Sequence, residues 1–330
     1  MRIFVTFLLL VGFCLAQHSS QNEPFDTVFW MHIQKTSSWL GNFLLLWGCS
    51  TIREDSQKFA LFTADSMMHT TISTKIPELK CEKHYYTGKF GYGYHIPYPT
   101  NMNHTTITLV RNPYNRVISA FMYGKGIHQI MFPKGFPNRA TVKFQLRDMI
   151  RKSEFPILTY ANLPGISSCQ IKMILGKECG EVLTLTINDI NEAKRRIQSD
   201  FYFIGLTEES EASARLFLAM YPINYNHFIQ NNHNMNQNSN QNNNENNMKK
   251  FNNIINNDIL VSTLKLAPRM NIRHNSSMND QYLSVLKEHN WKDYPDEEIY
   301  KETVVVFYER CKYYNIQTQY TAEQLLSLLI

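Results

Sequence analysis

The chain has 330 residues, with 33 Lys or Arg against 28 Asp or Glu, so its formal net charge is +5. Hydrophobic residues make up 43% of the sequence and aromatic residues 13%, which excludes a wholly disordered chain. The net charge is too small to indicate a nucleic-acid partner, although a mildly positive protein suits an anionic ligand or substrate.

The first 16 residues have the pattern of a secretory signal. Arg2 precedes an apolar run over residues 3–16, and the small side chains of Cys14 and Ala16 offer a cleavage site before Gln17. A first core helix is the alternative, but the run has no amphipathic pattern. We therefore expect residues 1–16 to be a signal peptide or a short uncleaved signal anchor, and as an anchor they would be the protein's means of membrane attachment. No later stretch holds the roughly 18 unbroken apolar residues of a membrane span.

Five cysteines remain beyond this signal, an odd number that leaves at least one thiol free or paired with another chain. Cys169 and Cys179 are the pair expected to form a disulfide, since they would close a short loop at the end of a helix. None of the five has the CxxC spacing of a zinc site, so we expect no metal. Two glycosylation sequons, at residues 103–105 and 275–277, agree with a secretory compartment.

Apolar runs alternate with helical patterns along the chain. Strands are expected at residues 27–33, 85–90, 105–110, 181–187 and 201–205. Helices are expected at residues 39–47, 113–123, 188–199, 207–221, 282–290 and 297–314. Pro113 suits the first turn of a helix, where its missing N–H costs nothing. Strands alternating with helices favour an α/β fold with a parallel sheet flanked by helices.

Residues 230–247 differ from the rest, because 11 of these 18 positions are Asn. Such a segment buries almost nothing, so we expect residues 230–257 to be a disordered insertion tolerated at the surface. A functional role for the insertion is the alternative.

A first candidate anion site follows the strand expected at residues 27–33. Lys35, Thr36, Ser37 and Ser38 form a polar turn at the start of a helix, where an ammonium, three hydroxyls and unpaired backbone N–H groups converge. The turn lacks the glycines and the GxxxxGK[ST] pattern of a Walker P-loop, which argues against kinases and NTPases. An ordinary surface turn with a helix cap is the alternative.

A second candidate anion site follows the strand expected at residues 105–110. Arg111 comes at the carboxyl end of that strand, where open α/β sheets bind ligands, and its guanidinium suits phosphate oxygens. Ser119, two helical turns further on, can share the same phosphate. Arg116 fits either a solvated helix surface or a structural ion pair.

Together these segments resemble the Golgi-type carbohydrate sulfotransferases of the heparan, chondroitin and uronyl kind. In that family a first motif, roughly HxPKTGGTS, cradles the 5′-phosphosulfate of 3′-phosphoadenylyl sulfate (PAPS), and a second, roughly LRxPxxRxxSxY/F, holds the 3′-phosphate. The first motif is matched by Lys35 and Thr36, and the second by Arg111, Pro113, Arg116 and Ser119. Weaker matches follow at residues 88–93, 170–176, 204–208 and 293–300, so the resemblance runs from about residue 28 to 310.

The resemblance implies a P-loop-like parallel sheet in a single sulfotransferase domain over residues 24–229 and 258–330. It implies PAPS as co-substrate, a carbohydrate hydroxyl as acceptor, no metal, and a place in the Golgi lumen or membrane, or secretion. The residues implied to bind the nucleotide are Lys35, Thr36, Ser37, Ser38, Arg111 and Ser119.

The chemistry needs a cation at the leaving group and a base at the acceptor. Sulfuryl transfer builds negative charge on the departing phosphate oxygen, and the Lys35 ammonium is expected to stabilise it. Relatives often carry Gly-His-Phe, with the His as general base, where this chain has Lys89 between Gly88 and Phe90. Lys89 can serve only with a lowered pKa, and His95 is the other candidate base.

Four cations recur every fourth residue at Arg139, Lys143, Arg147 and Arg151, which places them along one helix face. Such a stripe is expected to bind an anionic glycan, with a solvated helix face as the alternative. A second functional hypothesis is a catalytically impaired relative that binds nucleotide or anionic glycan without turnover, since Gln34, Ser37 and Ser38 depart from the family pattern. The remaining alternatives are another phosphate-binding α/β enzyme and an enzyme that sulfates protein tyrosines.

Overall fold

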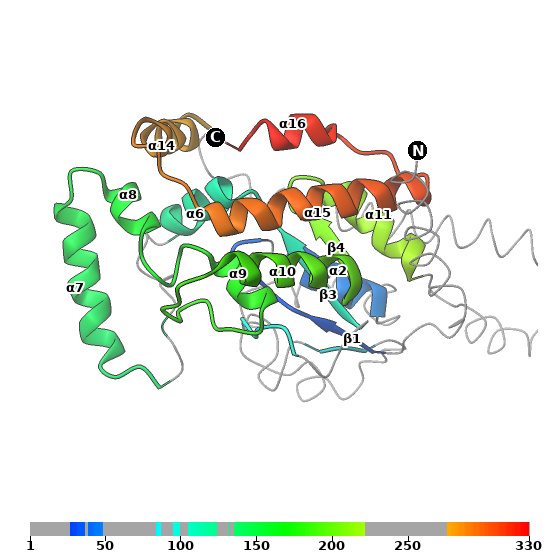
Figure 1. The fold of residues 1–330 in the computed structure, drawn as a ribbon, viewed down its shortest axis with the longest axis horizontal. Coiled ribbons are helices and arrows are strands. Elements are labelled where there is room, and N and C mark those ends of the chain that lie inside the picture. The colour runs from blue at the N-terminus through cyan, green and yellow to red at the C-terminus, as the bar shows by residue number, and fades with distance from the viewer. Residues whose placement is uncertain are drawn as a thin grey trace, which may run out of the picture.

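The computed structural model of the chain describes residues 27–36, 39–48, 84–86, 95–99, 105–123, 132, 135–221 and 276–329. The expected signal segment, the Asn-rich insertion and the asparagines of both sequons lie outside these residues. The elements (Figure 1) are β1 Thr27–Trp30, α2 Trp39–Gly48, β2 His84–Tyr86, β3 Thr106–Val110, α6 Pro113–Met122, α7 Arg139–Lys152, α8 Pro156–Ala161, α9 Cys169–Ile174, α10 Ile187–Ser199, β4 Phe201–Leu206, α11 Ser210–Met220, α14 Ser276–Glu288, α15 Tyr294–Tyr313 and α16 Ala322–Leu326.

The four strands form one parallel sheet in the order β2-β1-β3-β4. The chain therefore moves from β1 outward to β2 and then returns to β3 on the other side of β1. The turns that follow β1 and β3 start from neighbouring strands at the carboxyl edge of the sheet, which is the switch point where α/β sheets bind ligands. The expected α/β class with a parallel sheet is confirmed.

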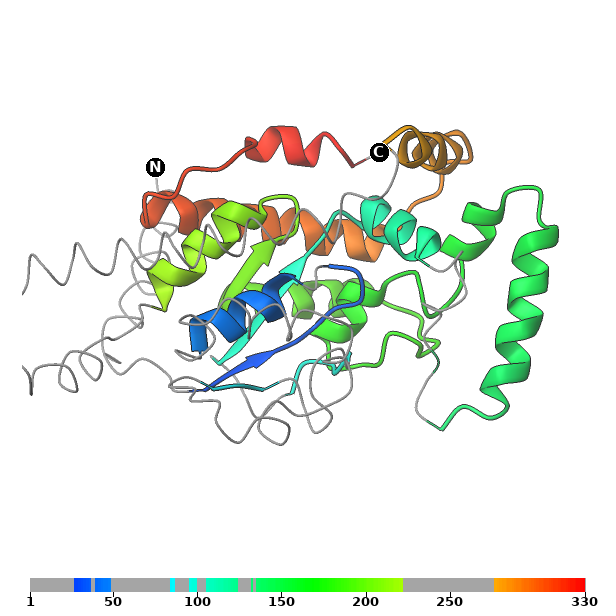
Figure 2. The ribbon, with the colours of Figure 1, turned by 180° about the vertical axis from the view of Figure 1, so that it is seen from behind.

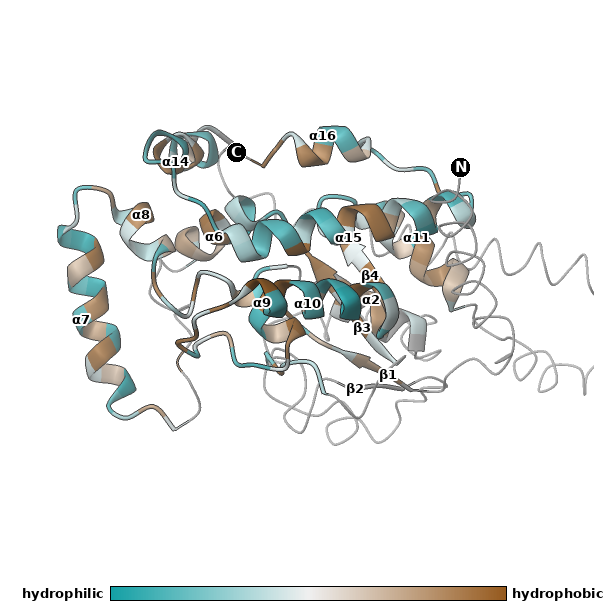
Figure 3. Ribbon diagram, in the orientation of Figure 1, coloured by the Kyte–Doolittle hydropathy of each residue, from teal (hydrophilic) through white to brown (hydrophobic). Residues whose placement is uncertain are grey.

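Helices cover both faces of this sheet. The α9 and α10 helices lie in front of the strands in Figure 1, whereas α2 and α11 lie in front of them in the reverse view of Figure 2. The β3 strand is buried along its whole length, and Figure 3 shows hydrophobic (brown) segments on the strands and on the helices around them. Burial on both faces encloses Thr106 and Thr108 together with the apolar residues of this strand.

Gly205 lets α11 pack closely on β4. A Cβ atom at this position would lie 2.7 Å from a Leu109 methyl carbon and 2.8 Å from the Ser213 hydroxyl oxygen. The Ser213 hydroxyl donates to the carbonyl of Leu206 and accepts from its N–H, each at 3.0 Å. The small residue therefore permits a helix-to-strand contact that fixes the turn after β4.

A second hydrophobic cluster lies at the end of the molecule where α6, α8 and α14 meet. Tyr114, Phe121, Tyr160 and Trp291 are among its buried members. The α7 helix packs beside α8 but stands away from the sheet in Figures 1 and 2, and among its residues Ile150 alone is buried.

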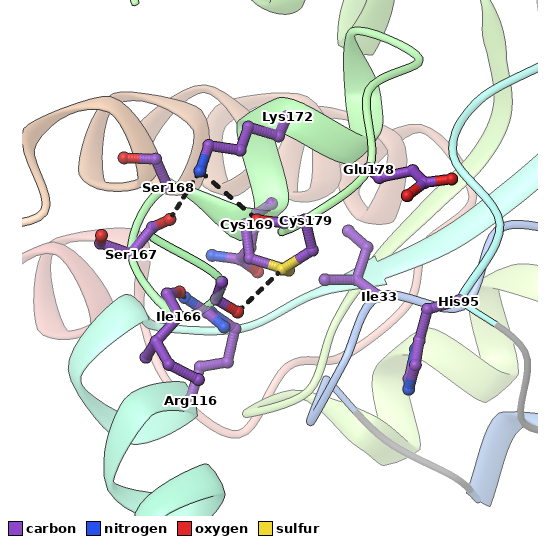
Figure 4. Close-up of a disulfide and its surroundings, with 12 residues drawn as sticks. Ile33, His95, Arg116, Ile166, Ser167, Ser168, Cys169, Lys172, Glu178 and Cys179 are labelled. Atoms are coloured by element: carbon purple, nitrogen blue, oxygen red, sulfur yellow. Dashed lines mark hydrogen bonds between the residues drawn. A yellow bond between two sulfur atoms is a disulfide. The ribbon is translucent and has the colours of Figure 1, made fainter. Parts of the chain in front are cut away.

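The disulfide between Cys169 and Cys179 is confirmed, with 4.6 Å between the two Cα atoms. It ties α9 to the loop that follows it, and the ammonium of Lys172 donates to carbonyls of this loop and its surroundings, including Cys179 (Figure 4). Cys311 is a free, buried thiol. No helix in the described ranges is long and apolar enough to cross a membrane.

The strand expected at residues 181–187 is wrong. Residues 181–186 are irregular, α10 begins at Ile187, and the side chains of Val182, Leu183 and Ile187 are exposed. The Thr186 hydroxyl and the Asp189 carboxylate form a capping box that starts the helix here. The β-branched residues of this segment imitate a strand, but the local cap decides the structure. The strand expected at residues 85–90 is described only over β2.

Candidate functional site

The turn after β1 is tightly closed. Thr36 donates from its backbone N–H and its hydroxyl to the carbonyl of Ile33, at 3.3 and 2.9 Å. Lys35 has a φ of 65°, in the left-handed region that residues with a Cβ rarely adopt. The positive φ thus falls on the lysine itself, and Ser37 and Ser38 lie outside the described residues.

The turn after β3 reaches this first turn directly. Arg111 follows the last residue of β3, and its guanidinium Nη1 donates to the carbonyl oxygen of Lys35 at 3.1 Å. Two residues that are 76 positions apart are therefore joined at the switch point of the sheet. Asn112 caps α6 by accepting from the N–H groups of Tyr114 and Asn115, so the turn that carries Arg111 has a defined geometry.

The side chain of Lys35 points to the end of α6. Its ammonium nitrogen lies 4.2 Å from the centroid of the Tyr123 ring, a cation–π contact. Ser119 is half-buried one helical turn earlier, and its carbonyl accepts from the N–H of Tyr123. Residues four apart share a helix face, so Ser119 lies on the same side of α6 as the lysine contact. Sequence reasoning missed Tyr123, although an aromatic residue one turn after Ser119 was the available signal.

Lys35 and Arg111 place two cations at the switch point, and among the described residues the carboxylate of Glu208 acts on Arg111. Burial, with the nearby charge of Arg111, lowers the pKa of Lys35 to about 8. Burial also lowers the pKa of Arg111, while the charge of Glu208 opposes that effect. Two half-buried cations so close together favour a bound anion, because the anion would relieve their repulsion and raise the pKa of Lys35.

The segment after β4 holds both turns in place. The Thr207 hydroxyl donates to the carbonyl of Thr36, and the Thr207 N–H donates to the carbonyl of Val110 at 2.9 Å. The carboxylate of Glu208 accepts from the N–H of Asn112 at 3.0 Å. This segment is part of residues 204–208, one of the weaker sequence matches, and it acts as a brace between the two candidate anion turns.

His95 lies beside the turn that carries Lys35. Its Nδ1 is 2.9 Å from the carbonyl oxygen of His32, and the two imidazole centroids are 4.8 Å apart. Because a carbonyl only accepts, this hydrogen bond places the proton on Nδ1 and leaves Nε2 of the neutral ring as a base. Burial lowers the pKa of His95, the His32 carbonyl raises it, and the charge of Lys35 lowers it further. The other candidate base, Lys89, lies outside the described residues.

Arg116 belongs to the framework rather than to the anion turns. It is fully buried and pairs with Asp296 at 3.4 Å and with Asp293 at 3.9 Å, so the ion-pair alternative describes it. Burial and the charge of Asp293 raise the pKa of Asp296 to about 7, while Arg116 opposes the shift.

The four cations of α7 lie apart from this centre. Arg139 and Arg151 are exposed, whereas Lys143 and Arg147 are half-buried. Because α7 stands away from the sheet (Figure 2), the structure does not bring these side chains to Lys35 and Arg111. Within the described part of the chain, no cluster of His, Cys, Asp and Glu has the arrangement of a metal site.

Comparison of the chain with protein-family models, curated proteins and solved structures finds no significant match.

Proposed function

We propose that this protein transfers a sulfuryl group from PAPS to a hydroxyl group of a carbohydrate in the secretory pathway. The observation that supports this most directly is the hydrogen bond between the Arg111 guanidinium and the Lys35 carbonyl at 3.1 Å. This bond joins two segments that are expected to bind opposite ends of one doubly phosphorylated nucleotide. It lies at the switch point of the sheet, where α/β proteins bind ligands.

In this proposal Lys35 and Thr36, with Ser37 and Ser38, bind the 5′-phosphosulfate. Arg111 and Ser119 bind the 3′-phosphate. The lowered pKa of Lys35 and its closeness to Arg111 support an anion at this point.

The acceptor hydroxyl oxygen would attack the sulfur of PAPS as the bond from sulfur to the bridging phosphate oxygen breaks. The electron pair of that bond leaves with adenosine 3′,5′-bisphosphate, and the Lys35 ammonium stabilises the charge on the departing oxygen. The hydroxyl proton passes to a base, for which Nε2 of neutral His95 is well suited. Lys89 remains the alternative base.

The four cations of α7, of which Arg139 and Arg151 are exposed, support an anionic acceptor. Arg139, Lys143, Arg147 and Arg151 would hold carboxylate or sulfate groups of a glycan that extends beyond the reacting sugar. Replacing all four with Gln should raise KM for the glycan several-fold and leave KM for PAPS unchanged. Lys152→Gln is the matched control, because Lys152 lies on the same helix but pairs with Asp148 at 2.7 Å.

The test incubates purified protein with radiolabelled PAPS and a panel of neutral and anionic glycans. We expect label on an anionic glycan, and loss of transfer in Lys35→Ala with the circular dichroism spectrum unchanged. Binding of adenosine 3′,5′-bisphosphate without transfer to any glycan would support the catalytically impaired alternative instead. Full activity of Lys35→Ala would overturn the role given to Lys35.

A further inference from the structure

Gln170 forms a two-point clasp on the backbone of Arg111. Its side-chain oxygen accepts from the Arg111 N–H, and its side-chain nitrogen donates to the Arg111 carbonyl, both at 2.9 Å. The side-chain amide therefore pairs with the residue after β3 as a neighbouring strand would. Gln170 is completely buried, so its side-chain amide cannot turn to water if the clasp is lost.

The clasp is itself held from behind. The backbone N–H groups of Gln170 and Ile171 donate to the two carboxylate oxygens of Asp296, at 3.2 and 2.9 Å. The adjacent residue, Cys169, is fixed by the disulfide to Cys179 (Figure 4). The start of α9 is thus attached to α15 and to its own following loop, which gives Gln170 a fixed position.

On its other side Arg111 leads to the first candidate anion turn. The position of its backbone determines where the guanidinium meets the Lys35 carbonyl at 3.1 Å. The contacts therefore form one continuous series from Asp296 through Gln170 and Arg111 to Lys35. Glu208 accepts a hydrogen bond from the N–H of the next residue, Asn112, and is not part of this series.

We propose that Gln170 is a positioning residue for the nucleotide site, acting through Arg111; this inference rests on the proposed function. Gln170 touches neither phosphate nor sugar in this account. It sets the orientation of Arg111 before the ligand arrives, so that the ordering of the guanidinium costs little on binding. Replacing it with an apolar side chain leaves the Arg111 N–H and carbonyl unpaired and loosens the turn.

The experiment measures the affinity for adenosine 3′,5′-bisphosphate by calorimetry in the wild type, Gln170→Leu, Arg111→Ala and the double variant. Gln170→Leu should bind about tenfold or more weakly, and the double variant should bind no more weakly than Arg111→Ala alone. Measurements are made at a temperature at which each variant is folded by circular dichroism. A variant that does not fold is replaced by Gln170→Glu, which keeps the acceptor but cannot donate to the Arg111 carbonyl, and the same loss is expected.

Thr303→Val is the control for lost stability, because Thr303 is fully buried on α15 and its hydroxyl donates to the Ile299 carbonyl, a bond outside the series from Asp296 to Lys35. It should lower Tm and leave the affinity unchanged. A Gln170 variant with the wild-type affinity, or losses that add in the double variant, would overturn the inference while the proposed function stands. Absence of binding by the wild type would overturn both.

Discussion

The ammonium of Lys35 lies over the ring of Tyr123, 4.2 Å from its centroid, and so connects the turn after β1 to the end of α6. In this position the lysine is partly withdrawn from water and close to Arg111, and its pKa falls to about 8. The charge state of Lys35 therefore changes within the pH range in which the protein can be studied.

Nucleotide affinity should fall as the pH rises above about 8, because only the protonated form of Lys35 attracts phosphate. Lys35→Arg keeps its charge throughout this range, so its affinity for adenosine 3′,5′-bisphosphate should stay nearly constant. Calorimetric titrations between about pH 7 and pH 10 make the comparison. An equal decline in the wild type and Lys35→Arg would show that another group titrates.

His95→Gln should reduce kcat by roughly 10²- to 10⁴-fold and leave nucleotide affinity nearly unchanged, since the ring acts on the acceptor proton. In the wild type the acidic limb of kcat against pH should lie below the usual histidine pKa of 6.5, because burial disfavours the imidazolium. Lys89→Gln is the matched comparison. A large loss in Lys89→Gln with none in His95→Gln would transfer the role of base to Lys89.

Asp293→Asn should change how stability depends on pH. The pKa of Asp296 is about 7 in the folded protein, against about 3.9 for an unfolded Asp, so between these values the folded state retains a proton that the unfolded state has lost. The free energy of unfolding of the wild type therefore gains a negative slope with rising pH. Removing the charge of Asp293 lowers the pKa of Asp296 and weakens that slope.

This variant can keep its local hydrogen bonds, because the Asp293 carboxylate accepts from the N–H and hydroxyl of Ser168 and an amide can bond to the same groups. Urea denaturation at several pH values between about 4 and 8 gives the free energy of unfolding against pH for the wild type and for Asp293→Asn. The free energy of unfolding of the variant minus that of the wild type should rise by about 1 kcal/mol or more between these pH values. Parallel curves would contradict this account of the pair.

Gly205→Ala should destabilise the fold by about 1–3 kcal/mol, since the added methyl group would overlap Leu109 and Ser213. Thermal denaturation measures this loss. An unchanged Tm would show that α11 can move away from β4 without cost.

Local patterns predicted most of the framework. The strand before Arg111, the helix from Pro113 and the disulfide of Cys169 with Cys179 each depend on residues close in sequence, and the structure has all three. The strand predicted at 181–187 was wrong because the β-branched residues of this segment fit a strand pattern, although their side chains are exposed. The Thr186–Asp189 capping box, which starts a helix here, was overlooked.

The site itself was only partly accessible from sequence. The α/β pattern predicted a parallel sheet, but it did not predict the strand order that makes β1 and β3 neighbours and so brings Lys35 and Arg111 together. The stacking of Lys35 on Tyr123 depends on side-chain directions. The clasp of Gln170 on Arg111 joins residues 59 positions apart, and no local signal marks a glutamine for that purpose.

The most direct test of the account is a calorimetric titration of folded protein with adenosine 3′,5′-bisphosphate, in parallel with Arg111→Ala. We expect saturable binding of one nucleotide per chain, weakened in the variant by about 1.5–3 kcal/mol through loss of a charge-assisted phosphate contact. No binding by the folded wild type, or equal affinity in the two proteins, would contradict the claim that Lys35 and Arg111 hold one nucleotide between them.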